Sequence, residues 1–443
     1  MVRLPAPAGW TMAALALAAC GADPGDAPAD ADADAAIDPS RCSRQPWDLI
    51  QLGTAAPDVA VAVVADAACN VTIAGSTFGD LGPGQAGLED VFVRRLPRAD
   101  DGWLRQLGSA SWDQVGGLAV TPAGDVIVVG TTSGQLPGAP PSAGNDDVFA
   151  LALDPSGARR WTTQYGTAGH DLGLGVALAE DGGLVIAGAV DPDVNGDYDA
   201  TLAQLDGRGR VVADQVIATD DRGDRGEAVA VAPGRGVVLV GGTLGPLAGD
   251  HQGSFDAFVV EHPAVGAART WGAQPATADI DAALDVAVDR DGSLLVLLVS
   301  YADLETGRSE DDGRQSPFVA RFEPGDPVPR WVRRVGPATA HTAAGALALD
   351  DAGRIYLAGL TEGALDGPSR GGRDAFVAVL DRDGALIRAH QLGTAGDDRA
   401  TDVVVTAAGD VVVVGVTAGD LTGRGEHAGE DDVFVARFDA PPR

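Results

Sequence analysis

The chain has 443 residues, of which 45% are hydrophobic, so it is long enough to bury a large core. Its 31 basic residues, all of them Arg, stand against 64 Asp and Glu residues, which gives a formal net charge of −33. This charge opposes binding to nucleic acid or to an anionic bilayer, and we expect no nucleic-acid partner.

The first residues have the features of an export signal. Arg3 supplies a positive charge, residues 11–19 form a short apolar core, and Leu17-Ala18-Ala19-Cys20 closes it. This closing sequence resembles a bacterial lipobox, which implies cleavage before Cys20 and attachment of lipid to its thiol. An ordinary cleaved signal that ends in Cys is the alternative. We predict a signal peptide over residues 1–19 and a lipid anchor without a transmembrane helix, because a span needs about 20 apolar residues.

Residues 20–44 are predicted to form an acidic tether. Residues 21–40 contain six Asp among Ala, Pro and Gly, and the first large apolar residue is Ile37. Such a segment buries too little apolar surface to offset the entropy of ordering it. Gly21 stands where some lipoproteins carry an Asp that retains them at the inner membrane. The expected location is therefore the outer membrane, with the protein facing the periplasm or the cell surface.

Two cysteines remain after Cys20, and an exported chain meets an oxidising compartment. Cys69 lies where other repeats have Gly in a hairpin turn, and Cys42 precedes the first strand. We predict a disulfide between Cys42 and Cys69 that holds the N-terminal strand, with two free thiols as the alternative.

From about residue 45 to the end the same pattern returns seven times. It consists of an apolar strand, a turn, a second apolar strand ending in Gly, a polar loop, and a strand with Asp first and Phe two residues later. Successive third strands begin 52 to 60 residues apart, which suits a four-stranded propeller blade. They begin at Asp90, Asp147, Asp199, Asp256, Ser316, Asp374 and Asp432, and Thr201 replaces one Phe.

The remaining strands define the architecture. Second strands such as residues 126–130 and 411–415 are apolar throughout, as expected for sheets buried on both faces. A fourth strand at residues 47–53 precedes all others, and the chain ends after a third strand at residues 433–438. All seven blades have four strands if the N-terminal strand completes the last blade. The predicted fold is all-β, a single seven-bladed β-propeller of four-stranded blades over residues 45–443.

The repeat also resembles a known family. The segment from Asp374 to Gly384, DAFVAVLDRDG, together with the Gly-x-Thr that ends many second strands, is similar to the bacterial secreted β-propeller repeat, the SBBP type. Residues 211–260 and 269–322 match it least. The resemblance implies a propeller in an exported protein. It brings no catalytic residues, because the family has no settled activity.

Carboxylates are the main candidates for binding. An Asp recurs five residues after the Gly that closes the fourth strand, and such residues on one face could line a cation-binding mouth. More commonly such an Asp accepts backbone N–H bonds and fixes its loop. The recurring residues are Asp58, Asp113, Asp171 and Asp398, and His341 is expected at this place in the sixth repeat.

Residues 191–199 have the spacing of a calcium loop. Asp191, Asp193, Asn195 and Asp199 offer oxygen ligands at positions 1, 3, 5 and 9 of the loop, with Gly196 at position 6. Leu202 stands where such loops usually have Glu, and an acidic turn without metal is the alternative. Ca²⁺ is the one cofactor that the sequence suggests.

Two functions remain open at this point. The lipid anchor, the tether and the long loops favour a non-enzymatic scaffold at the bacterial cell envelope that binds an envelope protein or a glycan. The alternative is a propeller enzyme of the lactonase, lyase or quinoprotein type, with an axial acidic or metal site. The sequence has no H-E-x-x-H motif and no phosphate-binding loop.

Overall fold

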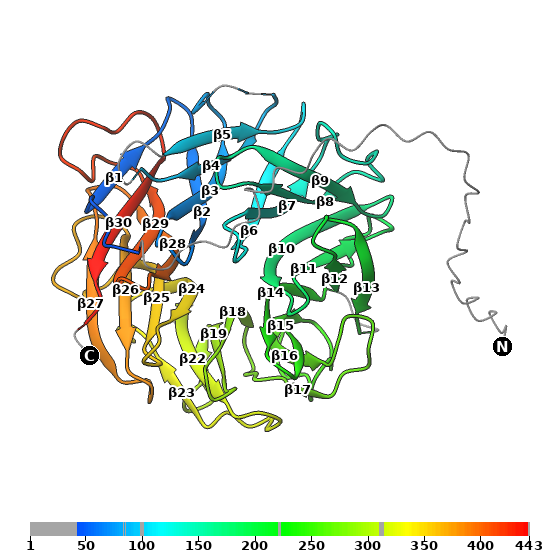
Figure 1. Cartoon of the computed structure of the whole chain (residues 1–443). Helices are drawn as coiled ribbons and strands as arrows, with labels where there is room; N and C mark the ends of the chain where they lie inside the picture. Colours follow the sequence, from blue (N-terminus) through cyan, green and yellow to red (C-terminus); the bar gives the residue numbers. More distant parts are fainter. Residues whose placement is uncertain are drawn as a thin grey trace, which may run out of the picture. The chain divides into compact units, whose positions relative to one another are not determined.

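The computed structural model describes residues 42–82, 84, 86–97, 102–219, 223–309 and 314–441. These residues form a ring of seven four-stranded antiparallel sheets, each of them a blade of a β-propeller, and contain no helix (Figure 1). The predicted all-β, seven-bladed architecture is confirmed. Cys20 and the predicted signal peptide lie outside the described residues.

Six blades take their strands in sequence order from the ring axis outward, and blade 7 takes its outermost strand from the N-terminal end. Blade 1 contains β2 (Asp58–Ala65), β3 (Val71–Thr77), β4 (Asp90–Arg95) and β5 (Trp103–Leu107). Blade 2 contains β6 (Asp113–Val120), β7 (Val126–Thr132), β8 (Asp147–Leu153) and β9 (Arg159–Tyr165). Blade 3 contains β10 (His170–Leu178), β11 (Leu184–Asp191), β12 (Asp199–Leu205) and β13 (Val211–Ile217). Blade 4 contains β14 (Arg225–Ala232), β15 (Gly236–Thr243), β16 (Asp256–His262) and β17 (Trp271–Ala273).

The last three blades follow the same order with two additions. Blade 5 contains β18 (Asp281–Val288), β19 (Leu294–Ser300), β22 (Ser316–Phe322) and β23 (Trp331–Arg334), and its long loop holds the hairpin of β20 (Ala302–Asp303) and β21 (Arg308–Ser309). Blade 6 contains β24 (Thr342–Leu349), β25 (Ile355–Thr361), β26 (Asp374–Leu380) and β27 (Leu386–Leu392). Blade 7 contains β28 (Asp398–Val405), β29 (Asp410–Thr417), β30 (Asp432–Asp439) and, from the N-terminal end, β1 (Leu49–Leu52).

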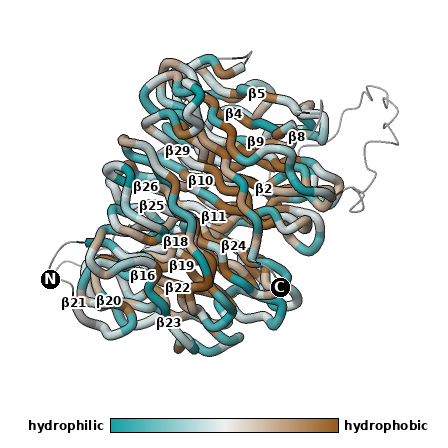
Figure 2. Tube along the Cα trace, turned by 90° about the vertical axis from the view of Figure 1, so that its left-hand side faces the viewer, coloured by the Kyte–Doolittle hydropathy of each residue, from teal (hydrophilic) through white to brown (hydrophobic). Residues whose placement is uncertain are grey.

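The hydrophobic core lies in the seams between neighbouring blades. Phe92 of blade 1, for example, packs against Val412 and Val433 of blade 7. The second strands are buried at nearly every position, because a blade covers each of their two faces. Figure 2 shows the consequence, with hydrophobic strands inside and hydrophilic connections outside.

Every inner strand carries a β-bulge at the same place. The pairing with the second strand shifts by one residue there, as between Ala60 and Ala62 or between Ala400 and Asp402. The residues skipped at the bulge are Val61, Gly116, Leu174, Glu227, Leu284, Gly345 and Thr401. All of them line the channel along the ring axis.

Strand β1 closes the ring, and this prediction is also confirmed. It pairs antiparallel with β30, so that Leu49 lies opposite Ala436 and Leu52 opposite Val433. Arg437 of β30 fixes the segment just before β1, because its guanidinium donates to the carbonyl of Trp47 at 3.0 Å. The first and last parts of the described chain therefore share blade 7 (Figure 1).

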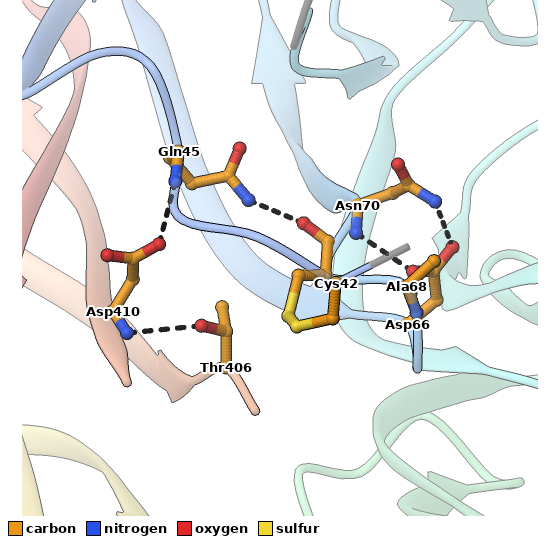
Figure 3. The surroundings of a disulfide bond; sticks show 8 residues. Cys42, Gln45, Asp66, Ala68, Asn70, Thr406 and Asp410 are labelled. Atoms are coloured by element: carbon orange, nitrogen blue, oxygen red, sulfur yellow. Dashed lines mark hydrogen bonds between the residues drawn. A yellow bond between two sulfur atoms is a disulfide. The ribbon is translucent and has the colours of Figure 1, made fainter. Parts of the chain in front are cut away.

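A disulfide bond ties the segment before β1 to blade 1. Cys42 and Cys69 have Cα atoms 4.8 Å apart, and Cys69 adopts a φ of 61°, in a turn where other blades use glycine. The amide of Gln45 donates to Asp410 of blade 7 at 2.7 Å, so the same short segment contacts both sides of the closure (Figure 3).

Deleting residues 42–53 should destabilise the whole ring by several kcal/mol, because it exposes the edge of β30 and part of two core clusters. Thermal unfolding followed by circular dichroism measures the effect. The control is the double variant Cys42→Ser, Cys69→Ser, which keeps β1 and should lose roughly 2–4 kcal/mol. A deletion protein that melts no lower than this control would contradict closure by β1.

Candidate functional site

The recurring Asp residues lie at the first or second position of the inner strands, and they are buried. Asp58, Asp113 and Asp398 are 0% exposed and Asp171 is 1% exposed. Each accepts the amide N–H of the residue four positions earlier, at 2.6 Å from Ser109 to Asp113. These contacts fix the connection between blades and leave the carboxylates away from solvent.

The same place is filled in the remaining blades. Asp224 and Asp281 occupy it in blades 4 and 5, with amide donors at 2.7 Å from Thr219 and 2.6 Å from Thr277. In blade 6 Thr342 stands there, one residue after the expected His341, and it bonds the Thr361 hydroxyl at 3.0 Å. The expectation for His341 is thus corrected by one position, because β24 begins at Thr342.

Burial raises the pKa of Asp58, Asp113, Asp171, Asp281 and Asp398, and hydrogen bonds from hydroxyl and amide groups oppose the rise. A second carboxylate contributes to each increase. It belongs to the Asp that begins the third strand of the preceding blade, such as Asp90 beside Asp113. The seams therefore contain pairs of buried acids.

A glutamine near the end of the fourth strand completes these seams, and the sequence reasoning missed it. In blade 2, Gln164 donates to Asp147 at 2.8 Å and to the carbonyl of Gly134 at 2.7 Å, and it accepts from the amide of Leu136 at 3.1 Å. The side chain thereby folds the long loop over its own blade. Its signal in the sequence is Gln two residues before the closing Gly, except at Gln274, where Ala276 stands in place of that Gly. The equivalents are Gln51, Gln106, Gln274 and Gln391.

The proposed calcium ligands lie in the loop between β11 and β12. Asp191 is 2% exposed, and its two oxygens accept from the amides of Asn195 at 3.1 Å and Gly196 at 2.8 Å. Asp193 and Asn195 are exposed, whereas Asp199 is half-buried at the start of β12. The part of the chain described here brings together no group of three His, Cys, Asp or Glu residues that could hold a metal ion. Calcium binding stays a prediction.

The axial channel forms a cavity of about 640 Å³. Apolar residues of blades 1 to 3, such as Val61, Leu118 and Leu174, line one part of its wall. Acidic residues line the part that comes from blades 4, 5 and 7, namely Glu227, Asp285 and Asp402. These acids lie at or directly after the bulge, which is why the sequence pattern gave no sign of them.

Asp285 and Asp402 connect neighbouring blades across the channel wall. Asp285 accepts the amide of Leu347 in blade 6 at 2.7 Å, and Asp402 accepts the amide of Val63 in blade 1 at 2.7 Å. Each also accepts the amide of the residue that follows it. Burial raises the pKa of Asp285 to about 6 and that of Asp402 to about 7, and for Asp402 the charge of Asp285 adds to the rise.

The loop face is the face of the ring made by the connections between blades and by the loops that join second to third strands. Trp112 is 45% exposed and Phe78 is 36% exposed on this face, and their rings meet edge to face with centroids 5.7 Å apart. Leu88, which is 56% exposed, lies close to Trp112, because its backbone amide donates to the carbonyl of Ser111. Next to Trp112, the side-chain Nε2 of Gln114 donates to the carboxylate of Glu89 at 2.9 Å.

Ser133, Asp146 and His170 form a polar group on the same face, between blades 2 and 3. The hydroxyl of Ser133 and Nδ1 of His170 both contact the carboxylate of Asp146. In a catalytic triad the histidine stands between the serine and the acid, whereas here the acid stands between the other two. This order leaves the serine hydroxyl without a histidine base, so the group lacks the arrangement of a triad and connects blades 2 and 3.

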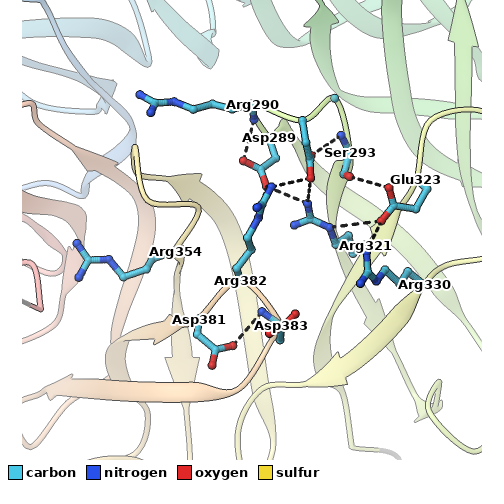
Figure 4. Close-up of polar contacts among 12 residues, drawn as sticks. Asp289, Arg290, Ser293, Arg321, Glu323, Arg330, Arg354, Asp381, Arg382 and Asp383 are labelled. Carbon is cyan, nitrogen blue, oxygen red and sulfur yellow. Dashed lines mark hydrogen bonds and ion pairs between the residues drawn. The ribbon is translucent and has the colours of Figure 1, made fainter. Parts of the chain in front are cut away.

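The opposite face, made by the hairpin turns, carries a network of charges between blades 5 and 6 (Figure 4). Arg321 of β22 contacts Asp289 at 2.9 Å and Asp291 at 2.7 Å, and Arg382 of blade 6 reaches the same two carboxylates. Arg382 thus links two blades through acids that are already paired with Arg321. We assign this network to stability of the seam.

Comparisons with known proteins do not assign the chain to a family. No protein-family model and no curated protein matches the chain. Among solved structures it is similar to the Neurospora crassa Pan2 WD40 domain, with 12% identity, a TM-score of 0.46 and coverage of 91% of this chain and 98% of that one. It is also similar to the polysaccharide lyase Uly1, with 10% identity, a TM-score of 0.47 and coverage of 88% and 90% respectively. These similarities concern the fold and assign no activity.

The stability of the ring should rise when the pH falls from 8 to 5. An acid whose folded pKa lies above its unfolded value near 3.8 binds its proton first in the folded state, so protonation stabilises the fold in this window. Asp285 and Asp402 together should contribute on the order of 4 kcal/mol between pH 8 and pH 5. Denaturant unfolding at several pH values measures the slope.

The double variant Asp285→Asn, Asp402→Asn should flatten this slope, whatever its stability at a single pH. Asp420→Asn is the control, because hydrogen bonding, led by the amide of Gly425, lowers the pKa of this exposed carboxyl. If the double variant keeps the full slope, the channel acids are not its source.

Proposed function

We propose that this chain is an exported, lipid-anchored propeller of the SBBP type that acts as a non-enzymatic binding scaffold at the bacterial outer membrane. The observation that carries the binding function is the exposed apolar patch on the loop face, made by Phe78, Leu88 and Trp112. Aromatic side chains held by a rigid frame are typical anchors of protein interfaces. The adjoining aliphatic Leu88 favours a protein partner over a glycan.

The state of the carboxylates supports a scaffold. A catalytic acid needs an oxygen within reach of the reacting atoms. The carboxylates at the start of the inner strands are buried, and their contacts are to backbone amides and hydroxyls of their own seams. Such contacts stabilise loops, which is the role that a binding scaffold requires of them.

The second candidate is a propeller enzyme with an axial acidic site. Asp285 and Asp402 favour it, because they line the channel and because pKa values of about 6 and about 7 suit general acid and base catalysis. Against it, each carboxylate accepts two amide N–H groups, one of them from the next blade. We therefore rank the scaffold first.

The anchor is tested by Cys20→Ala in the full-length chain. We expect the protein to move from the membrane fraction to the soluble fraction, because a lipid on this thiol would be its attachment to the bilayer. The described residues contain no helix long and apolar enough to cross a membrane. Fractionation with an immunoblot measures the change, and Cys42→Ala, Cys69→Ala serves as control. Retention of Cys20→Ala in the membrane would disprove the lipid anchor.

The binding function is tested with a photo-crosslinking residue in place of Leu88, in the cells that make the protein. We expect a crosslink to an envelope protein, and Trp112→Ala should reduce its yield about tenfold by removing the anchor ring. The control site is Val328, which is 67% exposed between β22 and β23, away from the loop face. Equal yields from both sites would count against binding at this patch.

A further inference from the structure

In the described residues, six of the seven blades cover their outer strand with the loop between the second and third strands. That loop places a leucine in the seam toward the preceding blade. A glutamine of the outer strand holds the loop, and in blade 5 Arg334 does so through Ser316 and Glu305. The leucines are Leu81, Leu136, Leu247, Leu304, Leu365 and Leu421.

Blade 3 differs in every part of this arrangement. Its loop, residues 192–198, is about half as long as the equivalent residues 133–146 of blade 2, and it contains no leucine. Val216 replaces the glutamine, since it pairs with Thr201 as Gln164 pairs with Phe149. Thr201 in turn replaces the phenylalanine of the other blades. The core cluster between blades 2 and 3 accordingly contains neither a phenylalanine nor a loop leucine.

The outer strand of blade 3 is therefore not covered by a loop. Val216 is 53% exposed, whereas Gln164, at the same place in blade 2, is 2% exposed. Val212 is 58% and Val211 38% exposed on the same strand. Their strand, β13, lies at the rim of the ring and hydrogen-bonds within the described chain to β12 (Figure 1).

β13 has Asp214 as its one charged residue and lacks the Arg residues of several other outer strands. Arg159 and Arg160 begin β9, and Arg388 lies in β27, whereas residues 211–217 contain no Arg. Charged side chains on an edge strand oppose pairing with another chain. An edge of seven residues with exposed valines and no Arg accepts an additional strand readily.

We propose that β13 is the docking edge for an extended segment of a partner protein, which adds a fifth strand to blade 3 and places bulky apolar side chains on Val212 and Val216. The six covered blades indicate the nature of this occupant. The partner supplies in trans the covering segment and the leucine that the other blades supply in cis. The inference rests on the proposed binding function and adds a second surface to it.

Charge indicates that the occupant is a different protein rather than a second copy. Antiparallel pairing of β13 with itself, centred on Asp214, would place two carboxylates opposite each other, which is unfavourable. A net charge of −33 on each chain adds repulsion between copies. A partner strand with Lys or Arg opposite Asp214, between apolar residues, meets both conditions.

A photo-crosslinking residue at Val216 of the full-length protein tests the proposal in the cells that make it. We expect a crosslink to one partner protein, which mass spectrometry maps to an extended apolar segment with a basic residue. Val212→Arg, which copies Arg160 at the equivalent bulge of β9, should reduce the yield about tenfold. The control uses Ile387, which is 47% exposed at the same bulge of β27, in a blade that keeps its glutamine and leucine.

A second variant closes the edge in cis. It carries residues 133–146 in place of residues 192–198, together with Thr201→Phe and Val216→Gln. This variant should unfold at the same or a higher temperature and lose the β13 crosslink, here from a probe at Val212. A crosslink from Leu88 that persists shows that the proposed function holds whether or not this inference does. The inference is overturned if Val216 crosslinks no more than Ile387, or reaches only a second copy or residues 1–41 of its own chain.

Discussion

The ring depends on carboxylates that are buried in its seams and held by N–H groups. Asp147 accepts the amide of Ala143 at 3.0 Å and the side chain of Gln164 at 2.8 Å. Its other oxygen fills the place of a side chain at Gly166, where a Cβ would lie 2.5 Å from Asp147 and 2.6 Å from Asp171. Glycine is therefore required at this place in blade 2. The spacing of five residues between the closing Gly and the next Asp, as between Gly166 and Asp171, reflects this contact in the sequence.

The same seam explains why the fold was readable in the sequence. Asp at the start of the third strand, Phe two residues later and Gly at the end of the fourth strand each have one structural task, repeated in most blades. Ring closure followed from counting strands, because an unpaired third strand at the end required a fourth strand from the beginning. The degenerate units were harder to place, since blade 3 lacks Phe and Gln together.

The channel acids could not be predicted for a physical reason. An alternating pattern assigns Asp285 and Asp402 to a face of the strand, but a bulge one residue earlier reverses that assignment. No residue type identifies the bulge in the sequence, because its position is taken by Val61 in blade 1, Gly116 in blade 2 and Glu227 in blade 4. Trp112 was not predicted from the sequence because connections between blades follow no periodic pattern.

In a repeat protein, the residues that recur are those that build the seams, and the exceptions deserve a functional explanation. Gln164 and its equivalents recur because each holds a loop, and their contacts are satisfied within one blade. Trp112 and Val216 differ from the residues at matching places in most other blades, and both leave apolar surface exposed at a cost of hydration. Exposed apolar surface that the repeat could have covered is best explained by a partner. The asymmetry of the ring therefore marks its binding surfaces.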